Sequence, residues 1–231
     1  MKTLGIIGGL GPESTIAYYG QIIASYRRQH PQGDYPSVII NSVNLRYLLS
    51  LMEAQRLGAA AEYLAREVER LAKAGADFGL LSANTPHIVF DEIQRRSPIP
   101  LLSIVQATCD AAKALSVARV GLFGTRFTMQ AKFYPELFSR AGINVILPDQ
   151  GERDYIHEKY MSELIQGVFL AETRARLWDI ALRMKERDGI EALILGGTEL
   201  PLILSNEQDS PVRLLDTTKI HVERAVAMLL S

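Results

Sequence analysis

Residues 5–8 read Gly-Ile-Ile-Gly, and residues 121–124 repeat the pattern as Gly-Leu-Phe-Gly. Each run is apolar, ends at glycine and precedes a segment of helical period, as in the βα units of parallel sheets. Two more pairs of similar segments follow in the same order, residues 80–85 with 194–199 and residues 100–115 with 211–226. The first and second segments lie 75 residues apart in one half of the chain and 73 apart in the other. This ordered repeat predicts two similar α/β halves.

Along the whole chain, short apolar runs alternate with longer segments of helical period. The expected strands cover residues 2–8, 37–43, 78–82, 100–104, 120–123, 143–147, 192–195 and 212–215. The expected helices cover residues 12–28, 55–74, 85–96, 106–115, 129–140, 153–167, 170–188 and 218–230. We therefore predict an α/β protein with two pseudo-symmetric three-layer domains, mostly parallel sheets and an active-site cleft between the domains.

The composition of the 231 residues excludes several classes of protein. The 25 Lys and Arg residues nearly balance the 26 Asp and Glu residues, so the charge gives no case for binding nucleic acid or an anionic membrane. No apolar run approaches the roughly 18–20 residues that span a bilayer, and no signal-peptide pattern opens the sequence. The single cysteine, Cys109, excludes an internal disulfide and a multi-cysteine metal site. We expect a cytoplasmic protein.

Four loops are expected where ligands bind in α/β proteins, at the carboxyl ends of strands. They cover residues 8–15, 83–87, 124–128 and 196–199. The first contains three glycines, but Ser14 stands where a dinucleotide-binding loop has its third fingerprint glycine, and no Gly-Lys-Ser/Thr follows. Nucleotide binding is therefore disfavoured, and a tight strand-to-helix turn competes evenly with a ligand-contacting loop.

Two of these loops carry hydroxyl groups that suit a carboxylate or phosphate. Thr125 and Thr128 are three residues apart at a helix start, where capping of the helix is the competing interpretation. Asn84 can donate to a carboxylate and accept from an ammonium group.

The other polar candidates each have a structural alternative. His87 suits a proton shuttle, although a lone histidine on a first helical turn is more often structural. Glu199 suits proton transfer, or it complements a helix dipole. Arg46 follows a strand and suits a carboxylate clamp, or it is a solvated loop residue. Cys109 is interpreted as a small core residue.

Taken together, the loop sequences resemble the aspartate/glutamate racemase superfamily of cofactor-independent amino-acid racemases over essentially the whole chain. The motifs are GIIGGLGPEST (5–15), SVN (42–44), ANTPH (83–87), GTRFTM (124–129), LGGTELPLI (195–203) and LLDTTKIHVERAVAML (214–229). The resemblance implies two pseudo-symmetric domains with the site between them, no pyridoxal phosphate and a homodimer. It also implies one domain of residues 1–98 plus 210–231 and a second of residues 99–209.

In that family, a cysteine precedes Asn-Thr in the first half and another precedes Thr-Glu in the second. One thiolate removes the α-proton and the other thiol returns a proton on the opposite face. The corresponding residues here are Ala83 and Gly197, and neither can move a proton. The resemblance assigns substrate binding to Asn84, Thr85, Thr125, Thr128, Thr198 and Arg46. Glu199 and His87 are then the fallback acid and base.

The sequence thus predicts an amino-acid racemase that inverts the α-carbon of a small carboxylate-bearing amino acid. Losing both thiols removes two groups that each contribute about 10²–10⁴-fold, which leaves four interpretations open. Other groups, such as Ser82, His87 or Glu199, take over; the chain performs a related carbanion reaction; it only binds an amino acid or dicarboxylate; or it is an engineered thiol-free form. We expect no cofactor or metal, and a small-molecule amino acid as partner.

Overall fold

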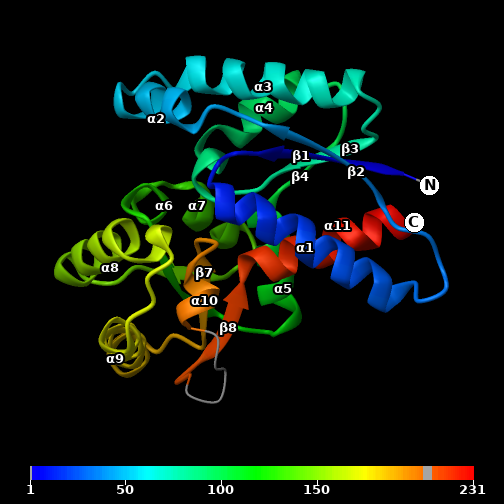
Figure 1. The fold of residues 1–231 in the computed structure, drawn as a ribbon. Coiled ribbons are helices and arrows are strands. Elements are labelled where there is room, and N and C mark those ends of the chain that lie inside the picture. The colour runs from blue at the N-terminus through cyan, green and yellow to red at the C-terminus, as the bar shows by residue number, and fades with distance from the viewer. Residues whose placement is uncertain (1, 205–209) are drawn as a thin grey trace. The chain divides into compact units, whose positions relative to one another are not determined.

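The structure, a computed structural model, describes residues 2–204 and 210–231 and divides into two compact units. Unit 1 comprises Met1–Ile104 and His221–Ser231, and unit 2 comprises Val105–Ile220. Each unit contains a four-stranded parallel sheet flanked by helices (Figure 1). The predicted α/β fold class, with two mostly parallel sheets, is confirmed.

The sheet of unit 1 runs in the order β2-β1-β3-β4. Its strands are β1 (Thr3–Gly8), β2 (Ser37–Ser42), β3 (Phe78–Leu81) and β4 (Leu101–Leu102). Its helical segments are α1 (Pro12–Gln29), α2 (Leu45–Glu53), α3 (Leu57–Lys73), η1 (Thr85–Val89), α4 (Phe90–Arg96) and α11 (Thr217–Leu230). Alternate residues of β1 point to opposite faces, so Ile7 packs with α2, α3 and α4 while Ile6 packs with α1 and α11. Unit 1 is therefore a three-layer sandwich (Figure 1).

The sheet of unit 2 has the corresponding order, β6-β5-β7-β8. Its strands are β5 (Arg119–Gly124), β6 (Asn144–Ile146), β7 (Ala192–Gly196) and β8 (Arg213–Asp216). Its helical segments are α5 (Ile104–Ala114), α6 (Arg126–Gln130), α7 (Phe133–Arg140), α8 (Gln150–Ser162), η2 (Leu164–Gln166), α9 (Ala171–Asp188) and α10 (Leu200–Ile203). The main core lies between the sheet and helices α8 and α9, where Phe123 and Leu195 meet Ile156 and Leu177.

Helix α8 shows how a local sequence signal fixes one boundary. Asp149 accepts a hydrogen bond from the Glu152 amide at 2.8 Å, and Glu152 accepts one from the Asp149 amide at 3.0 Å. This reciprocal capping box satisfies two amides that a helix start otherwise leaves without partners. It begins the helix at Gln150, three residues before the expected start at residue 153.

Three features differ from the sequence-based prediction. The sequence predicts no helix over residues 45–53, yet α2 forms there, and the Asn44 side chain caps it by accepting from the Tyr47 amide at 3.1 Å. The helix expected over residues 129–140 is two, α6 and α7, because Ala131 has an extended backbone. The helix expected over residues 85–96 begins as the 3₁₀ segment η1.

The expected domains, residues 1–98 plus 210–231 and residues 99–209, place two strands in the other sheet from the one that they join. Strand β4 pairs with β3 in the sheet of unit 1, and β8 pairs with β7 in the sheet of unit 2. The reason is proximity along the chain, because a short crossover returns each fourth strand beside the strand that precedes it. The chain passes into unit 1 for the last time within α11.

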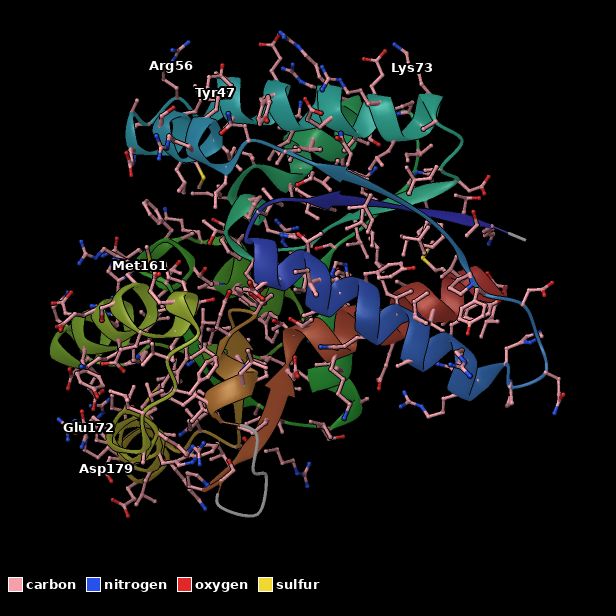
Figure 2. All side chains as sticks on the ribbon, in the orientation of Figure 1. Tyr47, Arg56, Lys73, Met161, Glu172 and Asp179 are labelled. Atoms are coloured by element: carbon pink, nitrogen blue, oxygen red, sulfur yellow. The ribbon has the colours of Figure 1, made fainter. Side chains whose placement is uncertain are left out.

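The outer faces of helices α3 and α9 carry charged side chains. Lys73 on α3 and the acidic residues Glu172 and Asp179 on α9 point away from the ribbon (Figure 2). Within residues 2–204 and 210–231, no helix is long and apolar enough to cross a membrane.

Candidate functional site

The carboxyl-terminal edge of the sheet in unit 1 brings three loops together. The buried Ser14 hydroxyl at the start of α1 donates to the Ser82 carbonyl after β3, at 2.5 Å. The Val43 amide after β2 donates to the Gly8 carbonyl at the end of β1, at 2.9 Å. Gly9 has a φ of 73°, and a Cβ there would lie 2.6 Å from the Val43 carbonyl oxygen. The geometry therefore supports the tight turn rather than a ligand-contacting loop.

His87 is held by the backbone through both ring nitrogens. Its Nδ1 lies 3.1 Å from the Ala83 carbonyl oxygen, and its Nε2 accepts from the Ile104 amide at 3.3 Å. The ring is buried and stacks on Phe90, and burial lowers the pKa of His87 to about 4. A neutral imidazole with both nitrogens engaged favours the structural alternative over a proton shuttle.

The remaining candidates of unit 1 differ in exposure. Asn84 is buried and Thr85 half-buried at the start of η1. Arg46 is exposed in the first turn of α2 rather than in a loop, so the structure does not bring it into the polar network around Ser14 and Ser82. The Ser82 hydroxyl donates to the Ile7 carbonyl at 3.1 Å and is therefore engaged by β1. Ala83, between these groups, has only a methyl side chain.

In unit 2, the loop after β5 places two hydroxyl groups side by side. Thr125 Oγ1 and Thr128 Oγ1 are 3.3 Å apart, and Thr128 is completely buried. Thr125 also accepts from the Thr128 amide at 3.4 Å and caps the five-residue helix α6. Capping, the alternative raised by the sequence, therefore engages the Thr125 oxygen as an acceptor while its O–H group can still donate.

The loop after β7 holds a polar network next to Gly197. A Cβ added to Gly197 would lie 2.5 Å from both Cε2 and Oη of Tyr160 on α8. The Tyr160 hydroxyl donates to Glu199 Oε2, and the Thr198 hydroxyl donates to the same oxygen at 2.8 Å. Tyr160 thus occupies the space that a side chain at residue 197 would need, and it links that space to a buried carboxylate.

The electrostatics of this network keep the phenol protonated. Burial raises the pKa of Tyr160 well above its ordinary value of 10, and the negative charge and hydrogen bond of Glu199 act in the same direction. The Tyr160 O–H group therefore remains a donor across the physiological range. Dipole complementation, the alternative use of Glu199, does not account for this contact with α8.

The similarity to known proteins extends over the strands of both sheets. The family model described as Asp/Glu/Hydantoin racemase matches residues 7–225. The chain belongs to this family. The match spans both units and includes every loop described above.

Other Asp/Glu racemase family members resemble this one over their full length. The chain is 34% identical to a Yersinia pestis protein that has been proposed to be an Asp/Glu racemase, with a TM-score of 0.92 and 100% of both chains covered. It is 32% identical to an aspartate racemase homologue from Pyrococcus horikoshii OT3, with a TM-score of 0.89 and the same coverage. It is 25% identical to the broad specificity amino-acid racemase RacX of Bacillus subtilis (strain 168), over 99% of this chain and 98% of that one.

Two residues of this racemase family member, Tyr160 and Cys109, differ in how far their surroundings could be predicted. The contact between Tyr160 and Gly197 could not, because Tyr160 lies 37 residues before Gly197 and no local motif marks it. The only sequence signal was helical periodicity, which predicts a helix there but not which neighbour a given side chain meets. Cys109 is buried in α5, and burial raises the pKa of its thiol, consistent with the interpretation as a core residue.

Proposed function

We propose that the chain is an amino-acid racemase-type enzyme that removes and returns the α-proton of a small carboxylate-bearing amino acid without pyridoxal phosphate. Membership of the racemase family over residues 7–225 supports the reaction class. The likeness to RacX, a broad specificity amino-acid racemase, supports an amino acid as the substrate.

Substrate binding is proposed for the polar residues at the carboxyl ends of the strands. Thr125, Thr128 and Thr198 offer hydroxyl groups in unit 2, and Asn84 and Thr85 offer an amide and a hydroxyl in unit 1. Groups of this kind donate to a carboxylate and accept from an ammonium, as an amino acid requires. Arg46, exposed on α2, is proposed as a clamp for a second carboxylate.

Proton transfer is proposed for Glu199, and the observation that carries the proposal is its position. It is a buried carboxylate two residues after Gly197, in the loop between β7 and α10, and it accepts hydrogen bonds from Tyr160 and Thr198. Ala83 and Gly197, the positions that the family resemblance assigns to thiols, have no group that can transfer a proton. His87 is the weaker fallback because both of its nitrogens bond to the backbone.

A second candidate function is binding without chemistry. The absence of any ionisable group at Ala83 and Gly197 favours it, because two-base inversion needs a proton-transfer group on each face of the α-carbon. An amino-acid or dicarboxylate-binding protein would keep the hydroxyl and amide groups and lack the turnover.

The deciding experiment is exchange of the α-proton in D₂O, followed by proton NMR for both enantiomers of aspartate, glutamate and other amino acids. Thermal shift in the same mixtures reports binding. Exchange that falls about 10²–10⁴-fold in Glu199→Gln supports the enzyme. Thermal stabilisation with no exchange at high protein concentration supports the binding protein and refutes the racemase proposal.

We also propose a cytoplasmic location, from the composition of the sequence, and a homodimer, from the family resemblance. Light scattering coupled to size-exclusion chromatography gives the mass directly, and a single 25.6 kDa species would contradict the dimer.

A further inference from the structure

The Tyr160 ring covers Gly197 in unit 2. The nearest ring atoms lie 2.5–2.8 Å from where a Cβ of residue 197 would be, far inside ordinary van der Waals contact. The ring is buried in the core formed by α8, α9 and the sheet, together with Ile156 and Leu164. The place of the missing thiol is therefore filled by a phenol that belongs to another element.

The same phenol is bonded to the acid that follows Gly197. The hydrogen bonds from Tyr160 and from Thr198 both reach Oε2 of Glu199. Among the described residues, Tyr160 from α8 is the titratable side chain that contacts this carboxylate. No hydrogen bond from the described part of the chain reaches the other carboxylate oxygen, Oε1, and we assign that oxygen to the substrate.

We propose that Tyr160 is a positioning residue: it orients the Glu199 carboxylate and stabilises its charge, so that the pair replaces, in unit 2, the thiol that Gly197 lacks. The inference rests on the proposed function. Glu199 is the catalytic residue, since it alone of the two would touch the reacting proton.

The step balances on the residues present. Glu199 Oε1 takes the α-proton from one face of the α-carbon, the electron pair of the broken C–H bond stays on the substrate as an enolate, and return of a proton by the resulting carboxylic acid regenerates the starting enantiomer. This exchange is the half of the reaction assigned to Glu199, and inversion needs a second proton donor on the opposite face. In D₂O the acid exchanges its proton with solvent between these events, so a deuteron is returned. Tyr160 keeps its own proton throughout, because burial and the neighbouring negative charge oppose formation of the phenolate.

Tyr160→Phe is the decisive variant, because it keeps the ring over Gly197 and removes only the hydroxyl that donates to Glu199. We expect α-proton exchange to slow about tenfold, the effect of one charge-assisted hydrogen bond. We also expect the acid limb of the rate-against-pH profile to move up by about one pH unit, because the ionised carboxylate has lost a donor. A purely structural role would leave this limb unmoved.

Tyr134→Phe is the matched control. Tyr134 is a buried tyrosine of the same unit on α7, and its hydroxyl contacts Thr108 rather than Glu199. It should leave both the exchange rate and the pH profile unchanged. Glu163→Gln is the matched control for Glu199→Gln, because Glu163 is also a buried acid of unit 2. Its carboxylate accepts a hydrogen bond from the Thr173 hydroxyl at 2.6 Å.

A second readout does not depend on turnover. With tyrosine labelled at ¹³Cζ, the resonance of Tyr160 is assigned by its loss in Tyr160→Phe and followed as the pH is raised. Removing the negative charge in Glu199→Gln should lower the pKa of Tyr160, whereas Glu163→Gln should not.

The outcomes separate the two proposals. An unchanged rate and pH profile in Tyr160→Phe, with exchange lost in Glu199→Gln, overturns the role of Tyr160 and leaves the proposed function intact. A Tyr160 pKa that does not respond to Glu199→Gln also overturns the pairing. Absence of exchange in the parent chain, with ligand bound, overturns the proposed function and the catalytic pair with it.

Discussion

Substituting Gly197 by alanine should destabilise unit 2 through one identifiable contact. The new Cβ would stand 2.5 Å from Tyr160 Cε2 and Oη and 2.8 Å from Cζ, where carbon atoms normally keep about 3.5–4.0 Å. Tyr160 is only 5% exposed, so its ring cannot simply swing into solvent. Overpacking of this kind costs about 1–3 kcal/mol, and we expect a loss in that range for Gly197→Ala. Gly197→Cys meets the same ring, so restoring a thiol there requires Tyr160 to move.

The reasoning is tested by a double-mutant cycle with Tyr160→Ala. Removing the ring alone should cost about 3–5 kcal/mol, as for other large aromatic residues. In that background, however, Gly197→Ala no longer meets the ring, so its own cost should vanish or change sign. The expected coupling is therefore about 1–3 kcal/mol, read from urea unfolding followed by circular dichroism. Gly20→Ala is the control, because a Cβ at this exposed position of α1 meets nothing within 4 Å. An equal cost of Gly197→Ala with and without the Tyr160 ring would refute the argument.

Three more predictions follow from contacts away from Gly197. His87 and His221 are buried with folded pKa values of about 4 and about 3, so below pH 6.5 only the unfolded chain takes up their protons. The free energy of unfolding should thus be independent of these groups above pH 6.5 and fall by about 2 kcal/mol for each between pH 6.5 and 5. Equal urea midpoints at pH 7.5 and 5 would contradict this. Asp149→Ala breaks the capping box of α8 and should cost about 1 kcal/mol in urea unfolding, with loss below 0.3 kcal/mol counting against it. Cys109 should react with a thiol reagent only after denaturant is added, because it is 1% exposed; rapid labelling of the native chain would disprove its burial.

The strands were predictable because their signal is local. Gly5-Ile6-Ile7-Gly8 and its counterpart at residues 121–124 are apolar, bounded by glycine and fully buried, as the repeat suggested. Helix α2 was less predictable, since its start depends on one side-chain contact, from the Tyr47 amide to Asn44, that periodicity does not reveal. The sheet that β4 and β8 join was the least predictable feature of the fold. Residues 99–104 and 210–216 lie near a change of unit, and periodicity carries no information on which sheet a strand joins.

The candidate site also has a part that local sequence predicts and a part that depends on tertiary packing. The loop after β7 and its carboxylate, Glu199, follow from strand and turn patterns in one stretch of sequence. Their neighbour Tyr160 does not, because α8 reaches Gly197 only through tertiary packing of a helix whose buried face is weakly marked. For His87 the sequence favoured a structural role over a proton shuttle, and contacts with Ala83 and Ile104, which engage both ring nitrogens, agree with the structural role.

The return of α11 to unit 1 has a consequence for synthesis of the chain. The core around Ile6, Tyr18 and Phe78 includes Val222, Val226 and Leu229, which are synthesised after the whole of unit 2. The Tyr18 hydroxyl likewise contacts His221 Nδ1, at 2.9 Å, only after residue 221 has been made. Unit 2 is continuous from Val105 to Ile220 and can fold as it is synthesised, whereas the first 104 residues of unit 1 must keep an apolar face open until α11 has been added. Chaperones that act during synthesis would therefore meet an incomplete first unit for as long as unit 2 is being made.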